Sequence, residues 1–299
     1  MQFMDNIINS MMEAVRQFFI EAIISQMYGF FDMLNERLGS AAEDLATTPM
    51  DFGGQVPWNR LMEIVNTAGS AVQIVAGLLL AFFIALELVQ MLIEKNNLAD
   101  LDIFSMLLKW AIKSFIAILI VANAFTIVGA IFELGAMLAL STAADAGEAI
   151  GESFNSYEFA IALEELNVGQ LFLLMFQIFI VHLFFNIVGI AIFVVVIGRF
   201  LEIFMYVAAA PIPLATMANQ EYRAMGNNYL KSLAALAFQS FLMIITISVV
   251  GTLMLSAVQS ITSDGAIGTS LFNVLGYIFL MCFALFKAPS ISKSIFNAQ

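Results

Sequence analysis

The feature that most constrains this chain is a series of long apolar runs. The run 171–198 holds 28 residues, and its only strongly polar side chains are those of Gln177, His182 and Asn186. A helix needs about 20 apolar residues to cross a hydrocarbon layer about 30 Å thick. A β-barrel would instead show alternating segments of about ten residues. The sequence therefore predicts an all-α, polytopic helical membrane protein.

Composition narrows the chemistry that the chain can perform. Of its 299 residues, 62% are hydrophobic and 11% are charged, and the formal net charge of −12 argues against a surface that grips phosphates. It contains one histidine and one cysteine, too few for a zinc site or an internal disulfide. No lysine follows a glycine, so no P-loop is present. We therefore expect no enzymatic activity, no cofactor and no metal.

The lysines and arginines indicate the orientation of the spans. None occurs between Lys113 and Arg199, or between Lys231 and Lys287. Short loops that carry Lys and Arg stay in the cytoplasm, which places the intervening loops outside, including an external loop at 134–170. The expected spans are about 68–93, 112–133, 171–198, 232–257 and 268–287. This gives about five spans in a bacterial cytoplasmic membrane, with the N-terminus outside and the C-terminus in the cytoplasm.

The N-terminal region differs from the rest. We expect 1–57 to be an external amphipathic helix and linker, and 58–299 to be the transmembrane domain. Apolar residues recur at helical spacing among polar ones. They are Met4, Ile8, Met11, Val15, Phe18 and Ala22. Such a helix either lies on the outer membrane surface or packs against neighbouring subunits.

The segment 199–217 follows the longest run and breaks its pattern. Both ends of 199–231 carry positive charge, so the apolar part between them should begin and end on one side of the membrane. The stretch 200–210 makes only about 16 Å of helix. Pro211 and Pro213 then remove two backbone donors. We expect a half-helix, a proline-broken turn and a return, which is a re-entrant or interfacial segment. Irregular backbone at membrane depth lines cavities or is buried in protein, which makes this segment the leading functional element.

Arg199, Glu202 and Tyr206 fall on one face of this helical stretch. Arg199 and Glu202 are three residues apart and can form an ion pair. Pairing would lower the cost of holding an arginine near lipid. Three interpretations stay open for Arg199: a side chain that marks the cytoplasmic edge of the span, a structural clamp, or a residue that lines a conduit.

The first span carries two further features. Small residues four apart form a ridge that favours close helix packing, and they are Gly77, Ala81 and Ala85. Glu87 lies farther along the same span. It is either protonated, paired with Lys109 or Lys113 of the next span, or part of an ion-binding site.

His182 lies in the middle of the third span, with Asn186 one turn farther on. Polar residues inside membranes usually face other helices and form hydrogen bonds with them. A structural packing role is therefore expected for His182, and a role in a proton relay or pore is the alternative.

Three stretches carry a resemblance to a known family. RFLE at 199–202, APIPLA at 210–215 and NQEYRAMGNNYLK at 219–231 resemble the TrbL-like, sixth-VirB-protein family of polytopic inner-membrane subunits of type IV secretion (conjugation) systems. The likeness is greatest to versions found in Gram-positive integrative elements. That family has a proline-containing apolar block after a central span, five or more spans and an external N-terminus.

The resemblance implies a non-enzymatic membrane platform or channel subunit. Such a subunit assembles as a homo-oligomer, with a ring as one form, in contact with membrane lipid and with other secretion subunits including cytoplasmic ATPases. It assists transfer of DNA or protein, which it contacts only transiently. The alternative from the residues themselves is a secondary transporter or ion channel that uses Glu87 and His182. An assembly factor without a conduit is a third interpretation.

Overall fold

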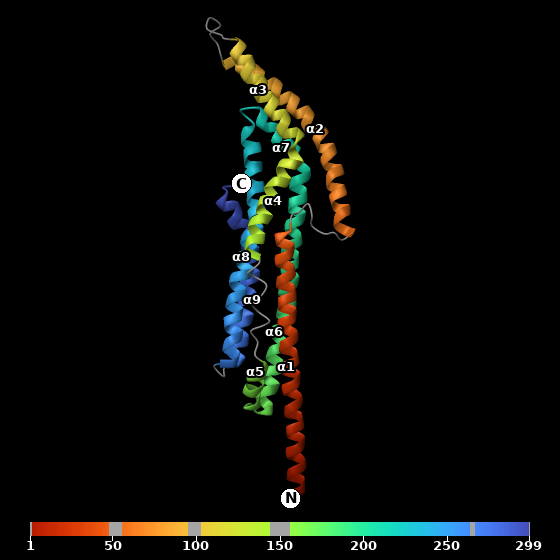
Figure 1. Ribbon diagram of the computed structural model, residues 1–299, viewed down its shortest axis with the longest axis vertical. Helices are drawn as coiled ribbons and strands as arrows, with labels where there is room; N and C mark the ends of the chain where they lie inside the picture. Colours follow the sequence, from red (N-terminus) through yellow and green to blue (C-terminus); the bar gives the residue numbers. More distant parts are fainter. Residues whose placement is uncertain (1, 48–55, 95–102, 144–155, 264–266, 299) are drawn as a thin grey trace. The chain divides into compact units, whose positions relative to one another are not determined.

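The structure, a computed structural model, describes residues 2–47, 56–94, 103–143, 156–263 and 267–298. Within these ranges all regular structure is helical, as the sequence predicted. The helices in chain order are α1 (Gln2–Ala46), α2 (Val56–Glu94), α3 (Ile103–Ala122), α4 (Ala124–Ala143), α5 (Ser156–Glu164), α6 (Val168–Ala209), α7 (Pro211–Ala215), the 3-10 helix η2 (Thr216–Ala218), α8 (Arg223–Ser263) and α9 (Ile267–Ile295) (Figure 1).

Six helices in the described residues are long and apolar enough to cross a membrane. The stretches are Glu63–Ile93, Phe104–Ala122, Ala124–Thr142, Val168–Ala209, Arg223–Met254 and Ile267–Ile295. All-α polytopic architecture is therefore confirmed. The structure differs from the expected span 112–133, because that stretch is divided between α3 and α4. Part of the expected external loop 134–170, namely 144–155, lies outside the described residues.

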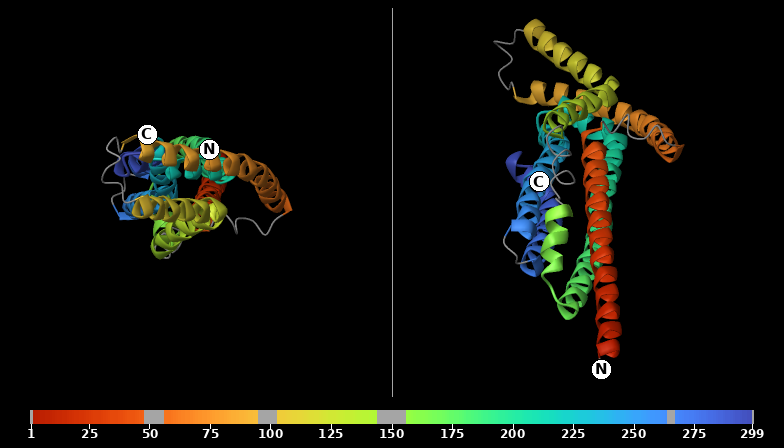
Figure 2. Two further views of the ribbon diagram at one scale, coloured as in Figure 1. Left: turned by 90° about the horizontal axis from the view of Figure 1, so that it is seen from above. Right: turned by 60° about the horizontal axis from the view of Figure 1, so that its bottom comes forward.

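The division between α3 and α4 has a local cause at Asn123. The side-chain amide of Asn123 donates to the carbonyl oxygen of Leu119 at 2.8 Å, and the backbone N–H of Asn123 donates to the same oxygen at 3.1 Å. Asparagine side chains that bond to nearby backbone groups compete with regular helix geometry. Figure 2 shows α3 and α4 meeting at an angle at this point. The hydropathy of the sequence does not indicate this bend.

The chain divides into two compact units by its internal contacts. The division at residue 57 that we expected stays a prediction. Unit 1 contains 1–46, 140–196 and 242–287. Unit 2 contains 47–139, 197–241 and 288–299, so α4, α6, α8 and α9 each contribute to both. The N-terminal helix thus belongs to a unit with parts of four span candidates. The external position of 1–57 stays a prediction.

In unit 1, α1 runs parallel to the first part of α6 (Figure 1). Phe19 contacts Phe172 near the start of this pairing, and Phe30 contacts Phe185 farther along, with ring centroids 6.3 Å and 5.3 Å apart. The later apolar residues of α1 are buried, with Leu34 at 0% exposure. The predicted stripe ahead of them is uncovered, since Met4, Ile8, Met11, Val15 and Phe18 are all exposed. Half of α1 is thus a packed bundle helix, and half carries a free apolar stripe.

In unit 2, the small-residue ridge does not pack against another helix of the described residues. Gly77, Ala81 and Ala85 are exposed, and a Cβ added at Gly77 would meet no atom within 4 Å. The close approach occurs instead at Gly135 of α4. A Cβ there would lie 2.5 Å from the carbonyl oxygen of Ala237 of α8. The sequence pattern alone could not say which glycine meets a neighbour.

These two glycines give a matched prediction. Gly135→Ala is expected to destabilise the protein by about 1–3 kcal/mol, because the backbone of α8 must move to admit the methyl group. Gly77→Ala is expected to be neutral or to stabilise by about 0.5–1 kcal/mol, because alanine favours helix and the space is open. Thermal denaturation of the purified protein in detergent measures both. Equal effects of the two substitutions would contradict the close α4–α8 contact.

Candidate functional site

The break after α6 is the centre of the candidate site, and it lies entirely in unit 2. The structure continues α6 through 199–209 without interruption, so the helix expected over 200–210 is present as the last part of the preceding long helix. None of these residues breaks a helix. Arg199 makes the sequence more polar at this point, but it does not lower the propensity of the chain to form a helix. The interruption begins at Ala210, where Pro211 opens the five-residue helix α7. The expected return of 199–217 to its starting side of the membrane stays a prediction.

After α7 the chain turns and reverses. The 3-10 helix η2 ends at Ala218, and the extended backbone of Asn219 (φ −113°, ψ 141°) leaves the helical region. The chain re-enters a helix at Arg223. The hydroxyl of Tyr229 on α8 donates to the carbonyl oxygen of Tyr206 on α6 at 2.7 Å, and the two rings stack at 5.9 Å. Together with a bond between Arg199 and Ser240, this pairing shows that the two helices run antiparallel on either side of the break.

The prolines of the break are packed between two helices. Pro211 is buried and Pro213 is half-buried. Both α7 and η2 contact α2 and α3. Gly226, in the first turn of α8, also approaches closely, since a Cβ there would lie 2.8 Å from the carbonyl oxygen of Pro213. The short helices α7 and η2 of the break are thus enclosed by protein, as expected for a broken helix in an apolar setting.

Arg199 and Glu202 do not form the ion pair expected from their spacing. Glu202 instead lies 3.2 Å from the ammonium group of Lys293 on α9. Arg199 is 4% exposed, and its Nη2 donates to the hydroxyl of Ser240 at 3.0 Å. Its Nε and Nη1 have no hydrogen-bond partner in the described residues. The partners of Arg199 and Glu202, which are Ser240 and Lys293, lie far away in the sequence. The three-residue spacing of Arg199 and Glu202 therefore could not indicate these interactions.

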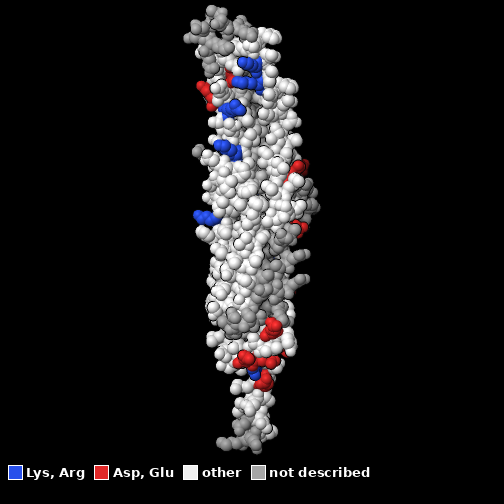
Figure 3. Space-filling model, turned by 60° about the vertical axis from the view of Figure 1, so that its left-hand side comes forward, with Lys and Arg blue, Asp and Glu red and all other residues white. Residues whose placement is uncertain are grey.

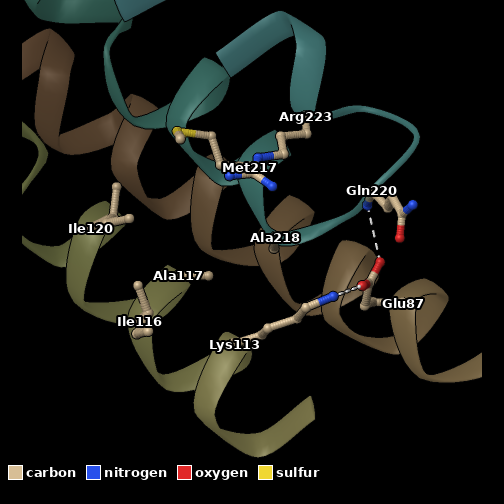
Figure 4. A pocket seen from close by; sticks show the side chains of 9 residues that line it. All are labelled: Glu87, Lys113, Ile116, Ala117, Ile120, Met217, Ala218, Gln220 and Arg223. Atoms are coloured by element: carbon tan, nitrogen blue, oxygen red, sulfur yellow. Dashed lines mark hydrogen bonds and ion pairs between the residues drawn. The ribbon is translucent and has the colours of Figure 1, made fainter. Parts of the chain in front are cut away.

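Glu87 holds the loop after the break against α2 and α3. Its Oε1 lies 2.8 Å from the ammonium nitrogen of Lys113, the second of the two lysines that the sequence offered (Figure 4). Its Oε2 accepts the backbone N–H of Gln220 at 3.0 Å. One turn farther along α2, the side-chain oxygen of Gln90 accepts from the amide of Asn219 at 2.8 Å.

A ring contact extends this set of interactions. Phe83 of α2, one turn before Glu87, lies 5.1 Å from the ring of Tyr222. Three consecutive positions on one face of α2 therefore bind the loop 219–222, and we call Phe83, Glu87, Gln90, Lys113 and this loop the latch. Sequence reasoning missed the latch as a unit. It named Glu87, and it quoted Asn219 and Gln220 as part of a motif, but nothing in one sequence joins them.

His182 and Asn186 lie in unit 1, where they connect α6 with α1. The ring nitrogen Nε2 of His182 donates to the backbone oxygen of Gln26 at 3.1 Å, and the His182 ring lies 5.3 Å from that of Phe30. The amide oxygen of Asn186 accepts from Arg37 Nη2 at 3.3 Å. These contacts are those of a helix-packing site, so the structure brings His182 and Glu87 into different units.

The composition of the site limits its chemistry. Within the described residues no group of three or more His, Cys, Asp or Glu side chains could hold a metal ion. The side chains of Glu87, Gln90, Lys113 and Asn219 are bonded to one another or to the backbone N–H of Gln220. Such an arrangement can fix or release a backbone segment.

Comparison with known proteins identifies the family. A family model described as TrbL/VirB6 plasmid conjugal transfer like protein matches residues 34–211, which is more than half of the chain. No curated protein and no solved structure matches it. The matched range contains Glu87, Arg199 and Glu202 and ends at Pro211, so the 219–231 part of the sequence resemblance lies beyond it. The expected family is confirmed, and the chain belongs to the TrbL/VirB6 plasmid conjugal transfer family, a membrane component of conjugative type IV secretion.

Proposed function

We propose that this protein is a homo-oligomeric platform or channel subunit that assists the passage of DNA or protein across the bacterial cytoplasmic membrane during conjugation. The observation that carries this proposal is the family match over 34–211. The family is a structural part of transfer systems and not a known enzyme family. The subunit therefore contributes surfaces and a path, and the cytoplasmic ATPases of the system supply the work.

Two uncovered surfaces support oligomerisation. The small-residue ridge of α2 is exposed, and small residues let helices approach closely in a bilayer, where lipid itself is as apolar as leucine. The first turns of α1 expose Met4, Ile8 and Met11 at 65%, 53% and 64%. We propose that copies of the chain meet along these surfaces. We also propose that α3 and α4 share one crossing, as the expected span 112–133 does, which leaves the N-termini outside and the C-termini in the cytoplasm.

The break, which the latch holds against α2 and α3, indicates where the opening of the conduit would lie. Positive charge at both ends of 199–231 favours the cytoplasmic side for this segment. The short broken element is packed between α2 and α3, and in a ring of copies it would be repeated around the central opening. We propose that 199–217 shapes the inner opening and that the latch holds it there.

The alternative ion path receives less support. Both carboxylate oxygens of Glu87 are occupied, and His182 bonds to a backbone carbonyl. A relay needs a group that can exchange protons along a connected path. Proton flux into liposomes that contain the protein tests this alternative with Glu87→Gln. Flux that depends on Glu87 would favour the transporter over the platform.

The first experiment on the proposed function is the mass and shape of the solubilised protein, by light scattering and particle imaging. A closed ring of several copies with a central opening is expected. A monomer or compact dimer that also fails to associate when its partner subunits are co-expressed would contradict the proposal. Deletion of the gene in a donor strain should abolish transfer, and the wild-type gene should restore it.

The pair Glu202–Lys293 gives a transfer prediction. Glu202→Lys is expected to lower transfer at least tenfold, because it sets two ammonium groups at the position of a 3.2 Å ion pair beside the break. The exchange Glu202→Lys with Lys293→Glu should restore most of the loss, since the pair is rebuilt in reverse. Mating efficiency, with membrane levels measured in parallel, checks both. Normal transfer by the single variant would remove 199–217 from the proposed mechanism.

A further inference from the structure

A pocket of about 400 Å³ opens beside the latch in unit 2. Its lining comes from α2, α3, η2 and the first residue of α8. The polar lining includes Glu87, Lys113, Gln220 and Arg223, and Figure 4 shows Lys113 and Arg223 approaching the pocket from different helices. The volume is many times that of a water molecule, about 30 Å³, so it admits a polar headgroup.

The charges of the pocket favour an anion. Glu87 is the one carboxylate in the lining, and both its oxygens are already bonded. Lys113 is half exposed, and an ammonium group has two further N–H donors after its bond with Glu87. Arg223 is exposed and has no bonded partner among the described residues. Two cations against one satisfied carboxylate leave a net positive site.

The wall next to these cations is apolar. Ile116 and Ile120 also line the pocket, three and seven residues after Lys113 on the same face of α3. Ile116 is 50% exposed, and the neighbouring Phe115 is 61% exposed. A cation followed along one helix face by exposed aliphatic side chains matches a molecule with a charged head and an apolar tail. A free anion has no apolar part that could pack against these side chains.

The surroundings favour a lipid of the cytoplasmic leaflet. Lys109 is exposed one turn before Lys113. Lys109, Lys113 and Arg223 all belong to unit 2, and Figure 3 shows basic side chains gathered in the upper part of the view. Basic pockets between membrane helices on the cytoplasmic side bind anionic headgroups.

We propose that this pocket binds the phosphate of an anionic phospholipid, with Arg223 and Lys113 at the phosphate and Ile116 and Ile120 along an acyl chain. The inference rests on the proposed function only for the orientation that puts this end of unit 2 in the cytoplasmic leaflet. Bound lipid would join α3 to the start of α8 across the mouth of the latch, and so would stabilise the closed loop.

The test is a titration of the purified full-length protein in detergent with phosphatidylglycerol, and separately with phosphatidylcholine, followed by native mass spectrometry. The variant is Arg223→Gln. The matched control is Lys231→Gln, an exposed cation two turns farther along α8 that does not line the pocket. Each cation near an anionic lipid surface contributes enough for about a fivefold change in affinity. We expect Arg223→Gln to lose about fivefold in phosphatidylglycerol affinity, Arg223→Lys to retain most of it, and Lys231→Gln to match wild type.

Equal affinities for the two lipids, or equal losses in the two glutamine variants, would overturn the proposal. Two competitors separate the sources of phosphate. Displacement of the lipid by millimolar inorganic phosphate alone would assign the pocket to a free anion, and displacement by a short single-stranded oligonucleotide would assign it to nucleic acid. Retention of the lipid against both supports the proposal. Because the assay needs no mating partner, its failure leaves the transfer function standing, and a failed mating assay leaves the lipid result standing.

Discussion

Replacing Lys113 with alanine is expected to destabilise the protein more than any other single change in the latch, by about 3 kcal/mol or more. The substitution leaves the Glu87 carboxylate, 4% exposed, with only the backbone N–H of Gln220 as partner. Removing one partner of a buried ion pair is costly because the other charge stays desolvated and unpaired. Glu87→Ala should cost less, about 2 kcal/mol, because the Lys113 ammonium that remains is half exposed and can be hydrated.

The ranking of the variants by stability is the strictest test of this prediction. The double variant Glu87→Ala with Lys113→Ala should be more stable than Lys113→Ala alone, since no unpaired buried charge remains. Glu221→Ala is the matched control: this exposed carboxylate adjoins Gln220, and its loss should change stability by less than about 0.5 kcal/mol.

Tryptophan fluorescence during thermal denaturation is a suitable measurement. The indole N–H of Trp110 on α3 donates to the carbonyl oxygen of Ile84 on α2 at 3.0 Å, so Trp110 reports on the contact that the latch joins. If the Lys113→Ala variant unfolds at the same temperature as the Glu221→Ala control, the ion pair does not hold α2 and α3 together.

Much of the architecture could be predicted because membrane insertion depends on local composition. The run 171–198 must be helical and apolar to cross a bilayer, and any window of the sequence reports this. Glu87 could be paired with a lysine of the next span for a similar reason, since an intramembrane carboxylate needs a partner nearby. In the structure, the lysine that pairs with Glu87 is Lys113 and not Lys109.

The parts that could not be predicted depend on contacts between distant residues. Glu202 pairs with Lys293 and Arg199 bonds to Ser240, so neither interaction follows from the three-residue spacing of Arg199 and Glu202. The bend at Asn123 arises from one side-chain hydrogen bond inside an apolar run. The helix expected over 200–210 is present, but it continues the preceding span without a boundary at Arg199, because only the prolines that follow interrupt the backbone.

Arg199→Met is expected to raise the stability of the purified protein, by about 1–4 kcal/mol. The guanidinium is 4% exposed and makes one hydrogen bond, to Ser240, while its Nε and Nη1 find no partner in the described residues. A cation–π contact with Phe200, at 5.5 Å, returns only about 0.5–2 kcal/mol. Taking an arginine out of water costs several kcal/mol, and exchanging an under-satisfied buried charge for an apolar side chain of similar length is often stabilising. Methionine is flexible enough to fill the same space.

Two comparison variants separate charge from shape in this prediction. Arg199→Lys keeps a buried charge with fewer donors, so it should show no gain and should melt below Arg199→Met. Lys231→Met removes an exposed cation of α8 and should leave the midpoint unchanged. Thermal denaturation of all three beside wild type decides the sign. A loss of about 2 kcal/mol or more in Arg199→Met would mean that the guanidinium has partners that compensate its burial. A gain would establish that the fold holds this charge at a cost, since neither the helix nor the packing around Ser240 requires it.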